Sequence, residues 1–545
     1  MNPPTPHHDV LIMGGGLAGL TLALQLKARF EGLDVLVVER RPHPVPLAAH
    51  KVGESTVEIG AHYFENVLGL KQHLQQQQIR KFGFRFFFSE GRRDIDQVTE
   101  LGASRVLPVQ SYQIDRGIFE NFLAEEAQRR GVRFVDAAIV KDMQLSEGKE
   151  PHQVSWQRDG ATHTATATWL VDACGRAGVI KRRLGLAQTN AHDANAVWFR
   201  IKDRIVIDDW SDNPEWRARC TPQERWRSTN HLVGAGYWVW LIPLSSGSHS
   251  VGIVADPSIH PLETYNTFDK AMTWLQTYQP RLFDELDGKR DLLQDFAFFK
   301  RFSYGCKQVF SAHRWALTGE AGLFLDPFYS PGSDFIAIGN TYITELIARD
   351  RAGQSLGAHA QLYDQVFHSF YESTLALYTG QYPMFADPEV LPVKVIWDYT
   401  YYWGVLSQMF FQNRLADLSS LAKLKDELAH CQKLNVAVQD FLRAWSVVSK
   451  MRNPAVMLDQ AALPWFAELN RSLNDTLDEA AFRTRLQQST VQLRALAGEL
   501  LARGCGEHPG LDGGALKALL DDVTREDPAA AVGHKPASML FPVFA

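Results

Sequence analysis

Three glycines near the amino terminus have the spacing of a nucleotide-binding turn. Gly14, Gly16 and Gly19 form the pattern G-x-G-x-x-G, and Glu39 follows twenty residues after the last of them. In such a turn the first glycine permits a tight bend, the second lets a pyrophosphate approach the backbone, and the third allows close packing of a helix on a strand. An acidic residue at this distance accepts hydrogen bonds from ribose hydroxyls. The pattern predicts a dinucleotide site.

The segments around these glycines have the order that the motif needs. Residues 9–13 (DVLIM) and 34–38 (DVLVV) are short apolar runs, and residues 20–30 repeat apolar side chains at helical spacing. Continuously apolar strands are typical of parallel sheets that are buried on both faces. We therefore expect a strand, a helix and a second parallel strand, with Leu17 and Ala18 at the helix terminus that binds the phosphates.

Three later segments indicate which dinucleotide is bound. The sequence D-x-x-G-R, which begins at Asp172, resembles a strand end of two-domain flavoproteins of the p-hydroxybenzoate hydroxylase type. Gly319-Glu320 resembles their second fingerprint, normally Gly-Asp, whose acid holds the ribityl chain of the flavin; glutamate is one methylene longer. Gln113 and Arg116 match the segment that supplies a glutamine and an arginine to the flavin. The resemblance implies FAD.

Three further motifs narrow the class of flavoenzyme. Residues 236–243 (GYWVWLIP) contain W-x-W-x-I-P, residues 324–332 (FLDPFYSPG) read F-x-x-P-x-x-S-x-G, and residues 52–56 read VGEST. Together they resemble the flavin-dependent halogenases, from the amino terminus to about residue 345. The resemblance implies an enzyme of secondary metabolism that uses FADH2, O2 and chloride or bromide. Its product, hypohalous acid, halogenates an aromatic ring that is held separately.

The resemblance assigns roles to residues of these motifs. Trp238 and Trp240 form a wall that keeps an organic substrate away from the flavin, so that halide reacts there instead. Their spacing alone fits a strand with one face in the core equally well. The halide lies at Ser330, Pro331 and Gly332, where backbone N–H groups can face an anion. Because proline has no N–H, Gly332 is the better donor candidate.

The family also needs a lysine that holds hypohalous acid or forms a haloamine close to the ring. Lys81, which opens the strand expected around residues 84–88, matches the family position, and its ammonium group can polarise the oxidant. Lys71 is the alternative, on a helix expected over residues 65–75. Tryptophan halogenases carry a glutamate just before the serine of the halide segment, whereas this chain has Tyr329. The resemblance therefore points to the phenol and pyrrole branch, several of whose members act on carrier-tethered substrates.

The expected fold is α/β, with a Rossmann-like FAD-binding domain, an inserted α+β substrate domain as in p-hydroxybenzoate hydroxylase, and a mostly helical carboxyl-terminal region. The predicted division is residues 1–84 for the first part of the FAD-binding domain, 85–300 for a mixed region with the inserted sheet and returning FAD-contact segments near 110–130 and 165–180, 301–345 for the last part of the FAD-binding domain, and 346–545 for the helical region.

The composition excludes several other classes of protein. The 545 residues are 45% hydrophobic and 22% charged, with a formal net charge of −6, so the chain can form a core and lacks the positive charge of a nucleic-acid-binding protein. The five cysteines form no C-x-x-C pair, which argues against a zinc site or a disulfide framework. The amino terminus lacks a signal-peptide pattern, and the most apolar stretch, residues 390–412, contains Lys394 and Asp398. We expect a cytoplasmic protein without a membrane span.

Partners and alternatives follow from the same motifs. No second nucleotide motif is visible for NADH, so a separate flavin reductase is expected to supply FADH2. The expected substrate is an aromatic small molecule or a ring tethered to a carrier protein. One alternative is an FAD monooxygenase or a geranylgeranyl-reductase-like enzyme, which oxidises NAD(P)H directly and needs no halide. A second alternative is a non-catalytic flavoprotein scaffold, which the departure of Glu320 from Gly-Asp leaves open.

Overall fold

The computed structural model describes residues 5–48, 52–526 and 538–541. The chain divides into two compact units, and each unit is built from three separate segments. The first unit contains residues 1–78, 114–191 and 302–371, and the second contains residues 79–113, 192–301 and 372–545. The predicted fold class is confirmed, because an α/β nucleotide-binding framework is interrupted by a second sheet-containing unit and followed by helices.

The first unit is built on a seven-stranded sheet in the order β7-β2-β1-β10-β9-β8, with β18 also paired to β10. Five of its strands are parallel, namely β7 (Arg133–Val135), β2 (Val35–Val38), β1 (His7–Met13), β10 (Ala161–Asp172) and β18 (Trp315–Leu317). Antiparallel pairing adds β9 (His152–Arg158) and β8 (Ile139–Gln144). All four residues of β2 are buried, as expected for a parallel strand covered on both faces.

The strand register of this sheet brings the predicted nucleotide motifs to one edge. Met13 pairs with Val38 and with Asp172, and Asp172 pairs with Leu317. The first glycine turn, Glu39 and the second fingerprint therefore follow the ends of neighbouring parallel strands. In doubly wound sheets this carboxyl edge is where ligands bind.

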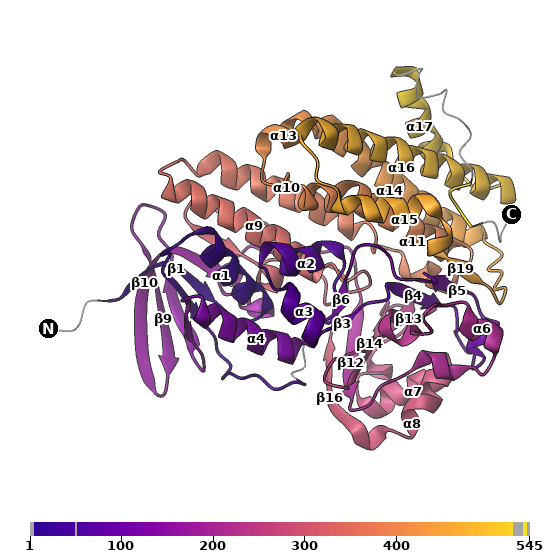
Figure 1. The fold of residues 1–545 in the computed structure, drawn as a ribbon, viewed down its shortest axis with the longest axis horizontal. Helices are drawn as coiled ribbons and strands as arrows, with labels where there is room; N and C mark the ends of the chain where they lie inside the picture. Colours follow the sequence, from indigo (N-terminus) through magenta and orange to yellow (C-terminus); the bar gives the residue numbers. More distant parts are fainter. Residues whose placement is uncertain (1–4, 49–51, 527–537, 542–545) are drawn as a thin grey trace. The chain divides into compact units, whose positions relative to one another are not determined.

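Helices cover this sheet, and several of them touch the motif segments. Helix α1 (Leu17–Arg29) packs against α4 (Arg116–Arg129) and α9 (Gly332–Arg351), and it lies beside β1 and β10 (Figure 1). The other helical segments of the unit are α2 (Glu58–His62), the π-helical turn η1 (Tyr63–Val67), α3 (Lys71–Gln77), α5 (Val179–Arg183) and most of α10 (Gly357–Leu375). The continuous helix predicted over residues 65–75 is wrong, because Gly69 takes a φ of 72° between η1 and α3, a left-handed conformation that ends helices.

The second unit contains an eight-stranded sheet in the order β16-β12-β15-β14-β13-β4-β5-β19. Its strands are β16 (Leu293–Phe299), β12 (Asn195–Ile201), β15 (His249–Ala255), β14 (Tyr237–Pro243), β13 (Thr229–Gly234), β4 (Phe84–Phe87), β5 (Glu100–Gly102) and β19 (Met457–Asp459). The pairs β13–β4 and β5–β19 are parallel and the others antiparallel.

The two faces of this second sheet differ in character. One face carries aliphatic and aromatic residues such as Val239, Leu241 and Ile253, which pack against α7 (Phe268–Tyr278) and α8 (Pro280–Asp287) (Figure 1). Side chains alternate between the faces of a strand, so Trp238 and Trp240 belong to the opposite face. That second face carries the residues of predicted functional interest.

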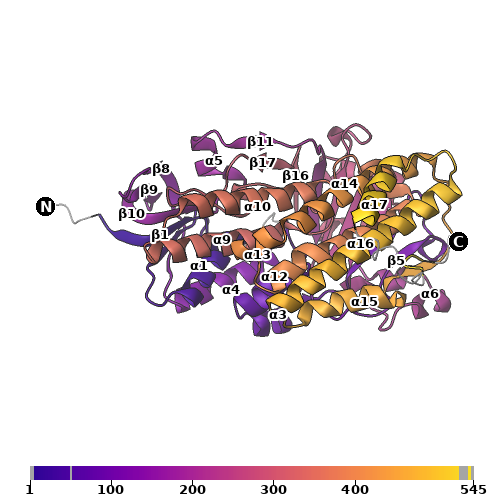
Figure 2. The same ribbon diagram turned by 90° about the horizontal axis from the view of Figure 1, so that it is seen from above.

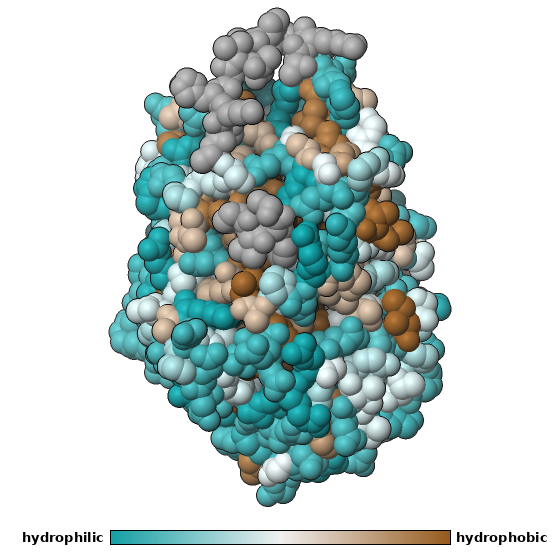
Figure 3. All heavy atoms as spheres, turned by 90° about the vertical axis from the view of Figure 1, so that its right-hand side faces the viewer, coloured by the Kyte–Doolittle hydropathy of each residue, from teal (hydrophilic) through white to brown (hydrophobic). Residues whose placement is uncertain are grey.

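The carboxyl-terminal part of the second unit is helical. Its helices are α11 (Val390–Tyr401), α12 (Gln408–Phe411), α13 (Leu418–Lys423), α14 (Lys425–Val448), α15 (Pro464–Arg471), α16 (Glu479–Glu507) and α17 (Gly514–Glu526), with a π-helical turn η10 (Tyr402–Ser407) joining α11 to α12. The long helices α14 and α16 run alongside each other (Figure 2). Within the described ranges, no helix is both long and apolar enough to cross a membrane. The molecular face drawn in Figure 3 is mostly hydrophilic, with small, separate apolar patches.

Candidate functional site

The first glycine turn has the geometry that a bound pyrophosphate requires. A Cβ atom at Gly14, whose φ is 108°, would lie 2.3 Å from the carbonyl oxygen of Ala173, and one at Gly19 would lie 2.0 Å from the carbonyl oxygen of Gly14. Both positions therefore exclude any side chain. A Cβ atom at Gly16 would meet no atom within 4 Å. Gly16 thus leaves open space at the amino terminus of α1, where phosphate oxygens can approach backbone N–H groups.

Glu39 is held beside this turn by two backbone hydrogen bonds. The N–H of Gly15 donates to its Oε2 at 2.6 Å, and the N–H of Arg41 donates to its Oε1 at 2.8 Å. The carboxylate is thereby fixed at the end of β2, next to the glycine turn. Its predicted contact with the adenosine ribose stays a prediction that fits this position.

Asp172 lies at the end of β10, and its carboxylate is occupied by its own loop. Cys174 and Ile180 donate their backbone N–H groups to its two oxygens at 3.0 and 2.7 Å, and the residue is fully buried. Burial raises the pKa of Asp172. The carboxylate therefore shapes the loop around the Gly175–Arg176 turn, and the predicted role of Asp172 in cofactor binding stays a prediction.

Glu320 lies among positively charged side chains of the first unit. The Nη1 atom of Arg176 is 3.9 Å from its Oε2 atom, and the same guanidinium lies over the ring of Tyr304, 4.8 Å from the centroid. Burial raises the pKa of Glu320, while the charges of Arg176, Arg116 and Lys181 oppose that rise. Because Arg116 also pairs with Glu120, these side chains form a network of opposite charges, and the predicted contact of Glu320 with the flavin stays a prediction.

Arg116 and Gln113 lie close in sequence but belong to different units. Arg116 donates to the carbonyl oxygen of Val52 at 2.5 Å and to Glu120 at 3.1 Å. The Nε2 of Gln113 donates to the hydroxyl of Thr229 at 3.0 Å. The predicted contacts of both residues with the flavin stay predictions.

The predicted halide segment forms the beginning of α9. Ser330 has a φ of 54°, an uncommon conformation for a residue other than glycine, and Pro331 is the N-cap residue. Gly332 is exposed, and a Cβ atom there would meet nothing within 4 Å. The first N–H groups of a helix lack partners within the helix, and its dipole attracts anions. Gly332 is therefore accessible at the start of α9, and the halide position predicted there stays a prediction.

One buried residue that the sequence analysis did not identify connects both fingerprints. The Oδ1 of Asn340 accepts a hydrogen bond from Thr318 Oγ1 at 2.7 Å, and its Nδ2 donates to Ala18 O at 3.2 Å, Thr21 Oγ1 at 3.1 Å and Tyr63 Oη at 3.1 Å. These partners belong to α1, η1 and the segment that precedes Gly319. Asn340 thus fixes the glycine turn relative to the second fingerprint.

The two tryptophans of W-x-W-x-I-P lie side by side on one face of the second sheet. The centroids of Trp238 and Trp240 are 5.7 Å apart. The N–H of Trp238 donates to Tyr382 Oη at 3.0 Å, and that of Trp240 donates to Ser250 Oγ at 3.1 Å. Gly252 makes room for the second indole, because a Cβ atom there would lie 2.2 Å from its ring. Both rings are buried and both N–H groups are bonded within the unit, and the predicted role of the pair as a wall stays a prediction.

Lys81 is a buried cation between β3 (Ile79–Arg80) and β4 in the second unit. It is 3% exposed, and its Nζ atom lies 3.3 Å from the centroid of the Phe84 ring. Such cation–π contacts stabilise a charge that has left water. Lys71, by contrast, is exposed at the first residue of α3. The position of Lys81, rather than that of Lys71, fits the predicted catalytic lysine.

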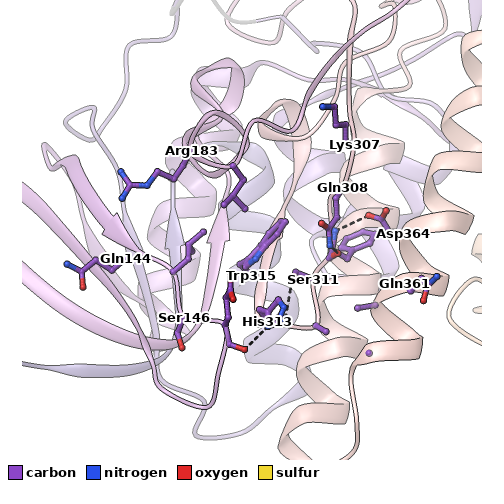
Figure 4. Close-up of a pocket in the computed structure, with 17 residues that line it drawn as sticks. Gln144, Ser146, Arg183, Lys307, Gln308, Ser311, His313, Trp315, Gln361 and Asp364 are labelled. Carbon is purple, nitrogen blue, oxygen red and sulfur yellow. Dashed lines mark hydrogen bonds between the residues drawn. The ribbon is translucent and has the colours of Figure 1, made fainter.

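A separate pocket of about 770 Å³ opens in the first unit (Figure 4). It lies between the β8–β9 turn, α5, the segment before β18 and α10, with Arg183, Lys307 and His313 among its lining residues. Trp315 lines the pocket from the first residue of β18, whereas the second fingerprint follows the last residue of that strand. The pocket is therefore distinct from the nucleotide edge of the sheet.

Comparisons with known proteins agree with the FAD assignment. Residues 7–250 match the family model described as an FAD binding domain. The chain is 29% identical over 371 residues to flavin-dependent halogenase chlA of Dictyostelium discoideum, covering 63% of this chain and 60% of the relative. It is 24% identical over 379 residues to flavin-dependent halogenase armH5 of Armillaria mellea, covering 65% and 67%. The chain thus spans about 60 to 67% of the length of these relatives.

Solved structures agree in fold. Halogenase PltM matches with a TM-score of 0.63 and 18% identity, over 91% of this chain and 96% of that chain. The flavin-dependent brominase Bmp2 matches with a TM-score of 0.54 and 23% identity, over 68% and 86%. These comparisons confirm the predicted FAD-binding fold and the resemblance to flavin-dependent halogenases.

Proposed function

We propose that this chain, which carries an FAD-binding domain and resembles the flavin-dependent halogenases, is itself a halogenase that uses chloride or bromide. The observation that carries the proposal is the shared sheet face of the second unit, where two indoles lie side by side and a buried lysine lies over a neighbouring ring. A sheet face that only needed to complete a core would not require a buried ammonium group there, because burying a charge is costly.

The first unit would hold the cofactor with the residues described above. Gly16 and the amino terminus of α1 would face the pyrophosphate, Glu39 the ribose, and Arg176 with Glu320 the region of the phosphates and the ribityl chain. When bound and reduced, FAD supplies the reducing equivalents with which O2 converts halide to hypohalous acid. The remaining steps depend on side chains of this protein.

The halide is proposed to bind at the start of α9, where the N–H of Gly332 and the helix dipole attract an anion. Ser330 and Pro331 set the direction of the first helical turn. Trp238 and Trp240 would exclude an organic ring and bulk water from the place where halide is oxidised. The indole wall thereby favours halide as the group that is oxidised.

Lys81 is proposed to direct hypohalous acid to the substrate. Its ammonium group can donate a hydrogen bond to the oxygen of HO–X, which makes hydroxide a better leaving group as the halogen moves to the ring. The proton lost from the ring carbon and the hydroxide released from HO–X together form water. Phe84 keeps the ammonium group in place through the cation–π contact.

The substrate is proposed to be an electron-rich phenolic or pyrrolic ring, free or tethered to a carrier protein. Tyr329 stands where tryptophan halogenases carry a glutamate, which supports this branch. A separate flavin reductase is the proposed source of FADH2, and the cytoplasm is the proposed compartment.

A halide-dependence assay tests this function without knowledge of the native substrate. The full-length protein is given FAD, a generic flavin reductase, NADH and O2, with and without bromide, and an activated 1,3-diketone traps hypobromous acid. We expect bromination of the diketone well above that of an enzyme-free control. If bound FAD is reduced and reoxidised but the diketone stays unbrominated, the monooxygenase alternative replaces the halogenase; if the flavin does not turn over at all, the scaffold alternative does.

A further inference from the structure

His231 lies on the same sheet face as the indole pair and next to the strand that follows Lys81. It belongs to β13, which lies between β4 and β14, and it pairs directly with Phe86 on one side and with Trp240 on the other. The proposed function does not use this residue.

The imidazole of His231 is surrounded by aromatic rings of the second unit. It stacks on Phe86 with centroids 4.7 Å apart and an interplanar angle of 15°. Its centroid lies 5.4 Å from that of Phe84, the ring that carries the Lys81 ammonium, and 5.3 Å from that of Trp238. The residue is fully buried. His231 therefore connects the ring below the lysine with the indole wall.

The chemistry of this position differs from that of its neighbours. On this face β13 also contributes Thr229, which bonds to Gln113, and Val233. A neutral imidazole has one ring nitrogen that donates and one that accepts a hydrogen bond, whereas Lys81 can only donate when charged. A phenylalanine would fill the same aromatic cluster without any polar atom. The hydroxyl of Thr229 both accepts from and donates to Gln113, whereas the imidazole of His231 brings a donor and an acceptor nitrogen between the indoles and the ring that carries the lysine.

We propose that His231 binds hypohalous acid between the indole wall and Lys81, accepting a hydrogen bond from HO–X at one ring nitrogen and retaining the oxidant until it reaches the lysine. No covalent bond forms or breaks at the histidine in this step. The inference rests on the proposed halogenase function and adds a residue to the part of it that lies on the sheet face of the second unit.

The test compares the transfer of bromine to a phenol ring with the escape of hypobromous acid into solution, where the diketone traps it. The full-length protein, FAD, a flavin reductase, NADH, O2 and bromide are supplied with a phenol and an excess of the 1,3-diketone, and the ratio of brominated phenol to brominated diketone is measured. Reagent hypobromous acid without enzyme gives the lower limit of this ratio. The variants are His231→Phe, which keeps the aromatic packing, and His231→Gln, which keeps a donor and an acceptor.

His260 offers a matched control on the opposite side of the sheet. It is also buried among aromatic rings, with centroids 5.2 Å from Tyr237 and 5.4 Å from Trp274, and its Nε2 lies 2.8 Å from Ala235 O. His260→Phe removes hydrogen bonds from a core that faces away from the indoles. We expect it to lower the thermal midpoint and leave the product ratio unchanged.

For His231→Phe we expect unchanged FAD affinity, unchanged total bromination and a product ratio that falls about tenfold, the effect of losing one hydrogen bond to a buried site. His231→Gln should recover part of the ratio. The inference is overturned if His231→Phe keeps the wild-type ratio, if both His231 variants lose FAD or total bromination together, or if the wild-type ratio equals that of the reagent. A wild-type protein that brominates neither acceptor overturns the proposed function itself.

Discussion

The substitution Gly16→Ala separates the binding of FAD from the stability of the fold. Gly16 has φ −86° and ψ −170°, values open to alanine, and its Cβ atom would meet nothing within 4 Å. Loss of a favourable N-cap glycine and the smaller entropy of the unfolded chain act in opposite directions, so the free energy of unfolding of FAD-free protein should change by about 1 kcal/mol or less. In the FAD-bound state the new methyl group occupies the space through which a pyrophosphate reaches the backbone. Overpacking of about 1–3 kcal/mol weakens FAD binding roughly 5- to 150-fold.

Gly19→Ala is the matched comparison, because its Cβ atom would lie 2.0 Å from the carbonyl oxygen of Gly14 in the absence of any ligand. Helix α1 must then move by roughly 1.4 Å to restore an ordinary contact, which lowers both stability and affinity. Titration of the FAD-free variants with FAD, followed by flavin fluorescence, measures affinity, and urea unfolding measures stability. Wild-type FAD affinity in Gly16→Ala would falsify the placement of the pyrophosphate at this turn.

Four further predictions concern separate parts of the molecule. Lys81→Met should keep diketone bromination and lose ring halogenation by at least about tenfold; equal loss of both products contradicts its role. Gly332→Ala should raise the bromide KM severalfold while leaving the thermal midpoint unchanged or higher, since the added methyl group meets no atom; an unchanged KM contradicts the halide position. Asn340→Leu leaves several buried partners unpaired and should lower the free energy of unfolding by roughly 2–4 kcal/mol, with weaker FAD binding; full FAD affinity contradicts its link between the fingerprints. Burial raises the pKa of Asp387 from 3.8 to about 6, so the stability that its neutral form provides is present below pH 3.8 and lost as pH rises through 6. Asp387→Asn should therefore be more stable than the wild type at pH 8 by up to about 3 kcal/mol and similar to it near pH 4, as measured by urea unfolding at both pH values; a difference that does not depend on pH contradicts the shift.

Local patterns in the sequence were sufficient to predict the strands that are continuously apolar and the turn that carries glycine at fixed spacing. The tryptophan segment, whose spacing fits a strand, forms β14, and the strand–turn–helix around Gly14 is β1 followed by α1. Burial on both faces leaves an uninterrupted apolar run, and a tight turn requires glycine, so each signal lies within a few residues. The positions of the two indoles on one face also follow from their spacing of two.

Contacts between residues that are far apart in the sequence could not be predicted from such local patterns. Asn340 lies 322 residues from Ala18, 319 from Thr21 and 277 from Tyr63, and nothing in the sequence around it marks a residue that bonds to all three. His231 gains its position because β13 pairs in parallel with β4 and antiparallel with β14. A shift of one residue in either pairing would turn the imidazole to the α7–α8 face. Register, which depends on the whole sheet, decides whether that side chain is a core residue or a functional one.

The choice between Lys81 and Lys71 also depends on the folded structure, although the two residues lie only ten positions apart in the sequence. Lys71 follows a short apolar stretch and Lys81 precedes one, and a continuous helix over residues 65–75 would have left Lys71 in the middle of a solvated helical face. The left-handed conformation of Gly69 interrupts that helix, and α3 starts at Lys71, which is exposed there. Lys81 follows β3 and is buried. There the ring of Phe84, brought in by β4, receives the ammonium group. A buried cation is tolerated only where such a partner is supplied, and the partner is recognisable only when the strand is in place. Burial, rather than spacing, therefore distinguishes the two lysines, and it makes Lys81 the side chain whose removal should separate halide oxidation from ring halogenation.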